Sequence, residues 1–125
     1  MAMDAQTLAR ACADAMWADD KASAALGMQI ESISPGEAVL SMTVRDDMVN
    51  GHAICHGGFI FTLADSAFAF ACNSDNHSAV ASGARIDFLA PGHLGDQLTA
   101  RARQLTQGRR TGVYDVEVSN QDGRR

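Results

Sequence analysis

Residues 50–73 read NGHAICHGGFIFTLADSAFAFACN, and this stretch decides the fold of the chain. It begins as a loop, and from Gly57 onward it is apolar almost all the way round. The apolar run is too long for a single buried strand, which favours a helix. A helix without a polar face is a buried one, and this helix is too short and too rich in small residues for a membrane span. The stretch therefore predicts a buried central helix.

The predicted helix opens with His56-Gly57-Gly58 and lacks the Ser, Thr, Asp or Asn that usually caps a helix start. Glycines leave the first backbone N–H groups unshielded, and the helix dipole adds partial positive charge there. Such an end can hold an anion, or an oxygen that becomes negative during a reaction. Gly57 is therefore a candidate oxyanion donor.

Asp65 is the only charged residue between His56 and Asn73. Its neighbours on the helix surface are mostly apolar, so we expect this carboxylate to be costly unless it has partners or a chemical role. Asp65 lies eight residues after Gly57, which is roughly 12 Å along a helix. A hydrogen bond reaches about 3 Å. If both residues serve one reaction, a second copy of the chain supplies one of them, as in a two-fold dimer with antiparallel helices.

Length and composition place this chain among small globular proteins. Its 125 residues fit one domain. The net charge of −5 argues against nonspecific binding to nucleic acid. The three cysteines, Cys12, Cys55 and Cys72, form no CxxC pair, which indicates a reducing, cytoplasmic location. The N-terminal residues include Asp4 and Asp14 and lack a continuous apolar core, so we expect no signal peptide.

Outward from the central helix, the sequence predicts one covering helix and five strands. The covering helix spans about residues 4–17, within an N-terminal segment of residues 1–24, and its apolar stripe is Leu8, Cys12, Ala15 and Met16. Alternating apolar residues and turn signals predict strands at 27–33, 38–45, 78–89, 96–105 and 112–119. An antiparallel sheet wrapped around the central helix, an α+β fold in one domain of residues 1–125, accommodates this order.

Asp122-Gly123 is a strong hairpin signal close to the C-terminal end of the sequence. We expect a returning strand after it, and none follows within residues 1–125. Without that strand, a sheet edge is expected to be exposed.

Three groups of residues together resemble the hotdog-fold thioesterases, and within them the PaaI type, named for bacterial phenylacetate degradation. They are Asn50-Gly51-His52, His56-Gly57-Gly58 and Leu63-Ala64-Asp65. The later runs 67–73, 86–91 and 95–96 fit the same pattern, so the resemblance covers most of the chain after residue 27.

The resemblance implies a five- or six-stranded antiparallel sheet around the helix. It further implies dimers that form a continuous sheet, either alone or as a tetramer made of two dimers. It also implies hydrolysis of acyl-coenzyme A thioesters, with a preference for ring-hydroxylated phenylacetyl groups and with no metal or other cofactor. Gly57 matches the glycine whose N–H polarises the thioester carbonyl, and Asp65, from the partner chain, matches the catalytic carboxylate. Asn50 and His56 match polar residues that line the site.

The residues by themselves are compatible with this reaction. An open helix end supplies an oxyanion donor, typically worth about 10²–10³ in rate. Asp65 can act as a base on water or attack directly to give a mixed anhydride, and the sequence leaves both routes open.

Coenzyme A carries phosphates, so an acidic protein needs a local basic patch to bind it. Arg109 and Arg110, in a predicted turn, are the best candidates, against the alternative that they are solvated surface charges. The small residues Ser82 and Gly83 would let a pantetheine arm lie along the predicted strand 78–89.

Other chemistries fit the sequence less well. His52, Cys55 and His56 resemble part of a metal cluster, but no spaced set of further ligands completes it. Cys55 beside His56 also allows a thiol nucleophile, whereas Ser66 faces about 100° away from Asp65. Gly57, Asn50, His52 and His56 each have a purely structural interpretation as turn or loop residues.

The sequence also leaves two other functions to be considered. A hotdog enoyl-coenzyme A hydratase would need a water-adding His and acid pair, for which His56 and Asp65 are a poor match. A non-catalytic acyl-coenzyme A sensor would have no use for a costly carboxylate at Asp65. Neither the acyl group nor the packing of dimers into tetramers is specified by the sequence.

Overall fold

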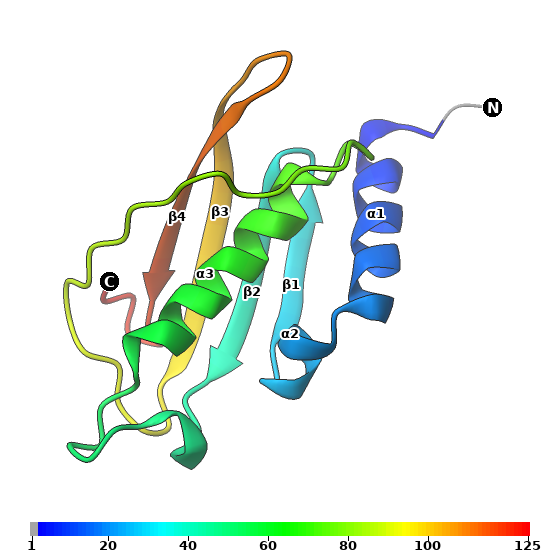
Figure 1. Ribbon diagram of the computed structural model, residues 1–125. Helices are drawn as coiled ribbons and strands as arrows, with labels where there is room; N and C mark the ends of the chain where they lie inside the picture. Colours follow the sequence, from blue (N-terminus) through cyan, green and yellow to red (C-terminus); the bar gives the residue numbers. More distant parts are fainter. Residues whose placement is uncertain (1–2) are drawn as a thin grey trace.

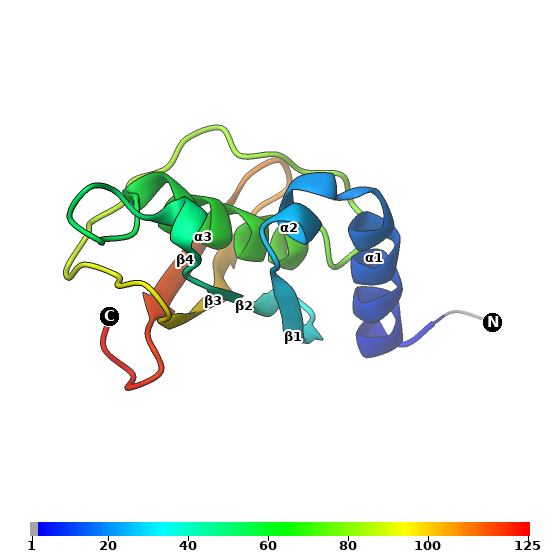
Figure 2. The same ribbon diagram turned by 90° about the horizontal axis from the view of Figure 1, so that it is seen from below.

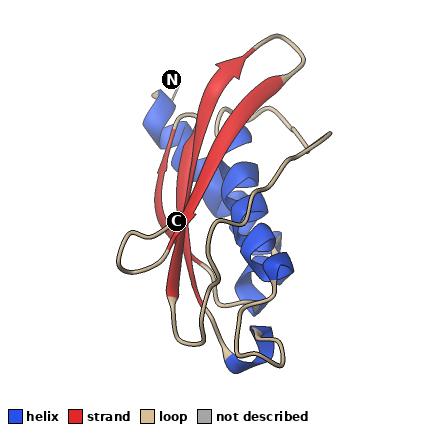
Figure 3. Ribbon diagram, turned by 90° about the vertical axis from the view of Figure 1, so that its left-hand side faces the viewer, coloured by secondary structure: helices blue, strands red, loops and turns tan. Residues whose placement is uncertain are grey.

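Helix α3 (Gly57–Cys72) lies along one face of a four-stranded antiparallel sheet in the computed structural model, which describes residues 3–125 (Figure 1). The strands follow the order β1 (Gln29–Ser34), β2 (Glu37–Thr43), β3 (Gln97–Gln107) and β4 (Gly112–Ser119). Figure 3 shows the sheet edge-on, with α3 on one side of it. The expected α+β arrangement of a sheet against a central helix is confirmed.

The core lies between α3 and the inner face of the sheet. Alternation places Ala38, Leu40 and Met42 of β2 on that face, all buried. Leu63 and Phe70 of α3 are buried against them, at 0% and 1% exposure. The burial of these apolar side chains determines which side of α3 packs on the sheet. Residues of the candidate site lie on the side of α3 that is not packed there.

Helix α1 (Ala5–Asp19) covers the outer edge of β1, as Figure 2 shows from below. Its Gln6 Nε2 donates to the carbonyl oxygen of Ile33 at 2.7 Å, which satisfies one group on that strand edge. The expected covering helix is confirmed, but its buried residues are Ala9 and Ala13. Ala15, expected on the buried stripe, is exposed because the helix presents a face rotated from the expected one.

A short helix α2 (Lys21–Ala25) follows, which the sequence analysis did not predict. Asp20 caps it by accepting from the backbone N–H of Ser23 at 3.0 Å. The Ser23 hydroxyl is 1% exposed and donates to Asp20 Oδ2 at 2.7 Å. It also lies 2.8 Å from the Ser66 hydroxyl, so α2 is joined to α3 by a part-buried polar contact.

The strand predicted at residues 78–89 is wrong for this chain: the segment is extended but belongs to no strand. It runs back from the end of α3 and passes outside β4, separated from it (Figures 1 and 2). Val80 is 89% exposed and Leu89 71% exposed. Alternation of side chains does not create a strand unless another backbone lies about 4.8 Å away to pair with it. The sheet therefore has four strands rather than the expected five or six.

The remaining strands agree with their predictions to within a few residues. β1 begins at Gln29 rather than at residue 27, and its pairing with β2 shifts between Ile30 and Ser32. The Asp122-Gly123 turn is present, with Gly123 at φ 79°. Asn120 N–H donates to the Arg124 carbonyl at 2.9 Å, and the Arg125 guanidinium pairs with Glu117 of β4, so the chain reverses beside β4. Within residues 3–125, no helix is long and apolar enough to cross a membrane.

Candidate active site

The start of α3 carries no side-chain cap. His56 is the N-cap residue, at φ −57° and ψ 133°, and its side chain makes no capping hydrogen bond. Its backbone holds the loop instead, because its N–H donates to the Met48 carbonyl at 2.9 Å. The His56 side chain is exposed. The uncapped glycine entry that the sequence predicted is therefore present, with the first N–H groups of the helix left for an oxygen ligand.

Asn50 organises the loop before α3. Its Oδ1 accepts from the backbone N–H of His52 at 2.9 Å and of Ile54 at 3.2 Å. The Asn50 N–H donates to the Ile54 carbonyl at 2.8 Å, which closes the turn. These bonds give Asn50 a clear structural role through its side-chain oxygen. His52 is exposed on the same turn.

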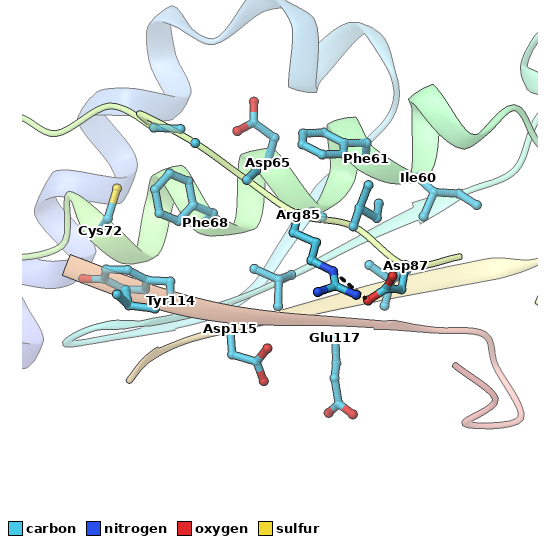
Figure 4. Close-up of a pocket in the computed structure, with 18 of the residues that line it drawn as sticks. Ile60, Phe61, Asp65, Phe68, Cys72, Arg85, Asp87, Tyr114, Asp115 and Glu117 are labelled. Atoms are coloured by element: carbon cyan, nitrogen blue, oxygen red, sulfur yellow. Dashed lines mark ion pairs between the residues drawn. The ribbon is translucent and has the colours of Figure 1, made fainter. Parts of the chain in front are cut away.

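Asp65 is exposed in the single chain. The expectation of a costly carboxylate on a buried face is therefore wrong for one protomer, because the face of α3 that carries Asp65 turns away from the sheet. Figure 4 shows Asp65 projecting from α3 on the side opposite to β4. Ile60, Phe61, Ala64 and Phe68 occupy the surrounding turns of that face and line the same cavity. Asp65 is thus an accessible carboxylate beside an apolar stripe.

The cavity measures about 1340 Å³ and lies between α3, β4 and the segment that connects α3 to β3. The residues suggested for coenzyme A all line it: Ser82, Gly83, Arg109 and Arg110. The first two come from the connecting segment and the other two from the β3–β4 turn. Asp65 and the suggested coenzyme A residues therefore line the same large cavity, whereas Gly57, His56 and Asn50 do not line it.

The connecting segment contributes charged residues to the cavity lining, whereas the Asp115 and Glu117 side chains of β4 point away from α3 (Figure 4). Arg85 and Asp87 of the connecting segment form an ion pair at 3.6 Å, drawn in Figure 4. Phe68 of α3 meets Tyr114 of β4 edge to face, with ring centroids 5.5 Å apart. Burial raises the pKa of the Tyr114 hydroxyl above its usual value, so Tyr114 is a neutral wall of the cavity at neutral pH.

Phe88 was not among the sequence candidates, yet it touches the start of α3. A Cβ placed on Gly57 would lie 2.8 Å and 2.9 Å from two carbons of the Phe88 ring. Phe88 also lines the cavity that contains Asp65, so its ring lies at the boundary between the helix start and the cavity. No local signal identifies this residue, because the contact joins positions 31 residues apart in the sequence.

Cys55 is buried, and burial raises the pKa of its thiol. A raised pKa leaves less thiolate at neutral pH, which argues against Cys55 as a nucleophile. Among residues 3–125, no group of three or more His, Cys, Asp or Glu side chains is placed to hold a metal ion. The helix start and Asp65 remain the candidate groups of the site.

Comparison with known proteins gives consistent matches. A family model described as the thioesterase superfamily matches residues 52–125. The acyl-coenzyme A thioesterase PaaI of Escherichia coli (strain K12) is 55% identical over 109 residues, which cover 87% of this chain and 78% of that protein.

Two solved structures are also similar. The E. coli PaaI protein from the phenylacetic acid degradation operon has a TM-score of 0.95 at 50% identity, covering 97% of this chain and 88% of that one. A hypothetical thioesterase from Streptococcus pneumoniae TIGR4, solved with coenzyme A, has a TM-score of 0.75 at 34% identity, covering 78% of this chain and 76% of that one.

Proposed function

The chain belongs to the thioesterase superfamily and has the hotdog thioesterase fold, and from this premise we propose that it hydrolyses acyl-coenzyme A thioesters to a free acid and coenzyme A. The observation that carries the proposal is the pairing, on one helix, of an uncapped glycine start with an accessible carboxylate two turns later. The similarity to an acyl-coenzyme A thioesterase at 55% identity supports the same substrate class.

Each step of the reaction has a candidate group in this chain. The thioester carbonyl oxygen binds at the Gly57 N–H, where the helix dipole stabilises the negative charge that develops on it. Asp65 either takes a proton from the attacking water or attacks the carbonyl itself. The carbon–sulfur bond then breaks and the coenzyme A thiolate leaves and is protonated. In the direct-attack route, water then hydrolyses the mixed anhydride, which releases the acid and restores the Asp65 carboxylate. Hydrolysis in ¹⁸O-labelled water under single-turnover conditions separates the routes, because only direct attack places label in the Asp65 carboxyl.

The two groups belong to different protomers in this proposal. Gly57 and Asp65 are eight residues apart, or roughly 12 Å along the helix, so one chain does not present both to one carbonyl. Asp65 is exposed in the single chain and is therefore available to a partner. A two-fold dimer gives two equivalent composite sites, and we place the dimers in a tetramer.

The proposed acyl group is a ring-hydroxylated phenylacetyl group. The apolar stripe of α3 that includes Phe61 and Phe68 offers aromatic side chains beside Asp65, and the E. coli relative comes from a phenylacetic acid degradation operon. The coenzyme A portion is assigned to Ser82 and Gly83 and to the Arg109 and Arg110 guanidinium groups, which suit phosphates. In this proposal no cofactor is needed, because coenzyme A is part of the substrate, and the free cysteines support a cytoplasmic location.

The test is thiol release from 4-hydroxyphenylacetyl-coenzyme A and from a long-chain acyl-coenzyme A. We expect wild type to prefer the aromatic substrate and Asp65→Asn to lose about 10²–10⁴ in kcat, because the amide can neither accept the proton nor attack. Asp46→Asn, an exposed change in the 3-10 turn Asp46–Met48, is the matched control.

Two outcomes contradict this assignment in different ways. If the Asp65→Asn variant still releases thiol, the protein is a thioesterase whose chemistry depends on another residue. Tight binding of acyl-coenzyme A without any release favours a sensor. Binding of acyl-coenzyme A has to be measured beside thiol release, because an exposed carboxylate carries little desolvation cost. The presence of Asp65 therefore does not by itself argue against a non-catalytic binding protein.

A further inference from the structure

We propose that Phe88 sets the acyl-group specificity of this thioesterase, by forming an aromatic wall directly beside the Gly57 N–H. The inference rests on the proposed function, since it concerns the acyl group of the same substrate. It assigns a role to a residue that touches the helix start from the segment between α3 and β3.

The Phe88 ring, rather than backbone conformation, limits the space for a side chain at position 57. The φ of Gly57 lies outside the left-handed region, so its backbone conformation is open to any residue. A Cβ there would instead lie 2.8 Å, 2.9 Å and 3.5 Å from three carbons of Phe88. At the next position, a Cβ on Gly58 would meet nothing within 4 Å. The ring therefore packs on the α-carbon of the residue that is the candidate oxyanion donor.

The rest of the Phe88 ring is open. Its side chain is 56% exposed although it contacts Gly57, so one part of the ring lies against the helix and another part faces outward. Phe88 and Ile60 line the same cavity as Asp65, and Ile60 follows Gly57 by nearly one helical turn on the same face. A thioester carbonyl bound at the Gly57 N–H would therefore place its acyl group against the ring.

An aromatic wall favours planar acyl groups. Ring pairs prefer offset or edge-to-face contacts, and these add about 0.5–1.5 kcal/mol beyond the burial of apolar area. That range corresponds to a preference of roughly two- to tenfold for an aryl over an alkyl group of similar size. The effect concerns recognition of the acyl group. It should therefore change the ratio of the kcat/KM values for the two substrates, and not the chemical step that both substrates share.

The test compares kcat/KM for 4-hydroxyphenylacetyl-coenzyme A and for hexanoyl-coenzyme A. We expect Phe88→Ala to lower the aryl-to-alkyl ratio by roughly two- to tenfold and Phe88→Tyr, which keeps the ring, to retain the wild-type ratio. Leu105→Ala is the matched control, since Leu105 is 54% exposed on β3 and does not line the cavity. The oligomeric state of every variant is measured by light scattering.

A second pair of variants tests the contact itself. Gly57→Ala should lower turnover of both substrates, because its methyl group collides with the ring. Adding Phe88→Ala in the same chain should restore turnover of hexanoyl-coenzyme A while the aryl preference stays lost. If the double variant is no better than Gly57→Ala, the contact does not control the site and the proposal is overturned.

The outcomes also separate this inference from the proposed function. Wild type that hydrolyses neither thioester contradicts the function itself. Wild type that hydrolyses both, with an unchanged substrate ratio in Phe88→Ala, overturns only the role of Phe88. Loss of the wild-type oligomer in Phe88→Ala also overturns it, because the ring would then be an interface contact between copies.

Discussion

At the scale of single residues, Asn50 combines a loop role with a position in the candidate site. Its Oδ1 accepts two backbone hydrogen bonds, from His52 and Ile54, in the loop that leads to the uncapped start of α3. A residue that fixes this loop also fixes where Gly57 lies. Its effect on activity can therefore arise through the loop alone, without any contact with the substrate.

We expect Asn50→Ala to lower the free energy of unfolding by about 1–3 kcal/mol, because two backbone donors, an exposed one at His52 and a part-buried one at Ile54, lose their acceptor. Asn50→Asp keeps an oxygen at the same place and should retain most of the stability. Urea denaturation measures this, with thiol release followed in parallel. Full stability of Asn50→Ala combined with lost turnover would contradict the loop role and assign Asn50 to the chemistry.

Asp65 is a residue whose surroundings the sequence argument predicted wrongly, because the carboxylate is exposed in one chain. The sequence indicates an unusual carboxylate within an apolar run, and a cavity does surround it. The assumed burial is absent in one chain, because only the face of α3 toward the sheet is covered. The case for Asp65 therefore depends on its access to a partner and to substrate, not on strain.

At the scale of elements, Asp96 joins the start of β3 to the turn after β4. Its carboxylate accepts from the His93 backbone N–H at 2.8 Å and from the Gln121 side chain at 3.1 Å. These bonds, with the backbone N–H of His93 contributing most, lower the pKa of Asp96. A carboxyl whose pKa is lower in the folded chain stabilises it above the unfolded pKa of about 4. This stabilisation is lost as the pH falls through the lower, folded pKa.

We therefore expect Asp96→Asn to weaken the acid sensitivity of folding. The wild-type chain should lose more stability between pH 7 and pH 3 than the variant does, since the variant has no carboxyl to protonate at this position. Urea midpoints at the two pH values measure the difference, with Asp122→Asn in the neighbouring turn as the control. Equal losses in wild type and Asp96→Asn would contradict the assigned role.

The sequence predicts a strand at residues 78–89, but the structure has an unpaired connecting segment there. Its apolar residues resemble those of a strand, but Val80 and Leu89 are exposed and no neighbouring backbone pairs with the segment. A strand is defined by its partner, and alternation identifies only which side chains would share a face. The outer edge of strand β1, by contrast, is covered by helix α1, and the Gln6 side chain donates a hydrogen bond to the Ile33 carbonyl oxygen there.

At the scale of the whole molecule, the proposed composite site would make activity a property of the assembly. We expect Asp65→Ala chains and Gly57→Ala chains to be inactive alone and to recover activity when mixed. In a random mixture half of the dimers are mixed, and each has one intact site, so about a quarter of wild-type activity should return. Thiol release after co-refolding measures this. Each variant refolded alone is the control, and a mixture as inactive as its parts would contradict a site shared between chains.

The sequence by itself determined the central helix, its uncapped glycine start, the position of Asp65 and most strand boundaries. These follow from local chemistry: the length of an apolar run, missing caps, alternation and turn residues. Only the tertiary structure decided that Asp65 is exposed, that residues 78–89 lie apart from the sheet and that Phe88 packs on Gly57. Each of these depends on which distant segment lies opposite a residue, and contacts between segments far apart in the chain leave no periodic signal in either one.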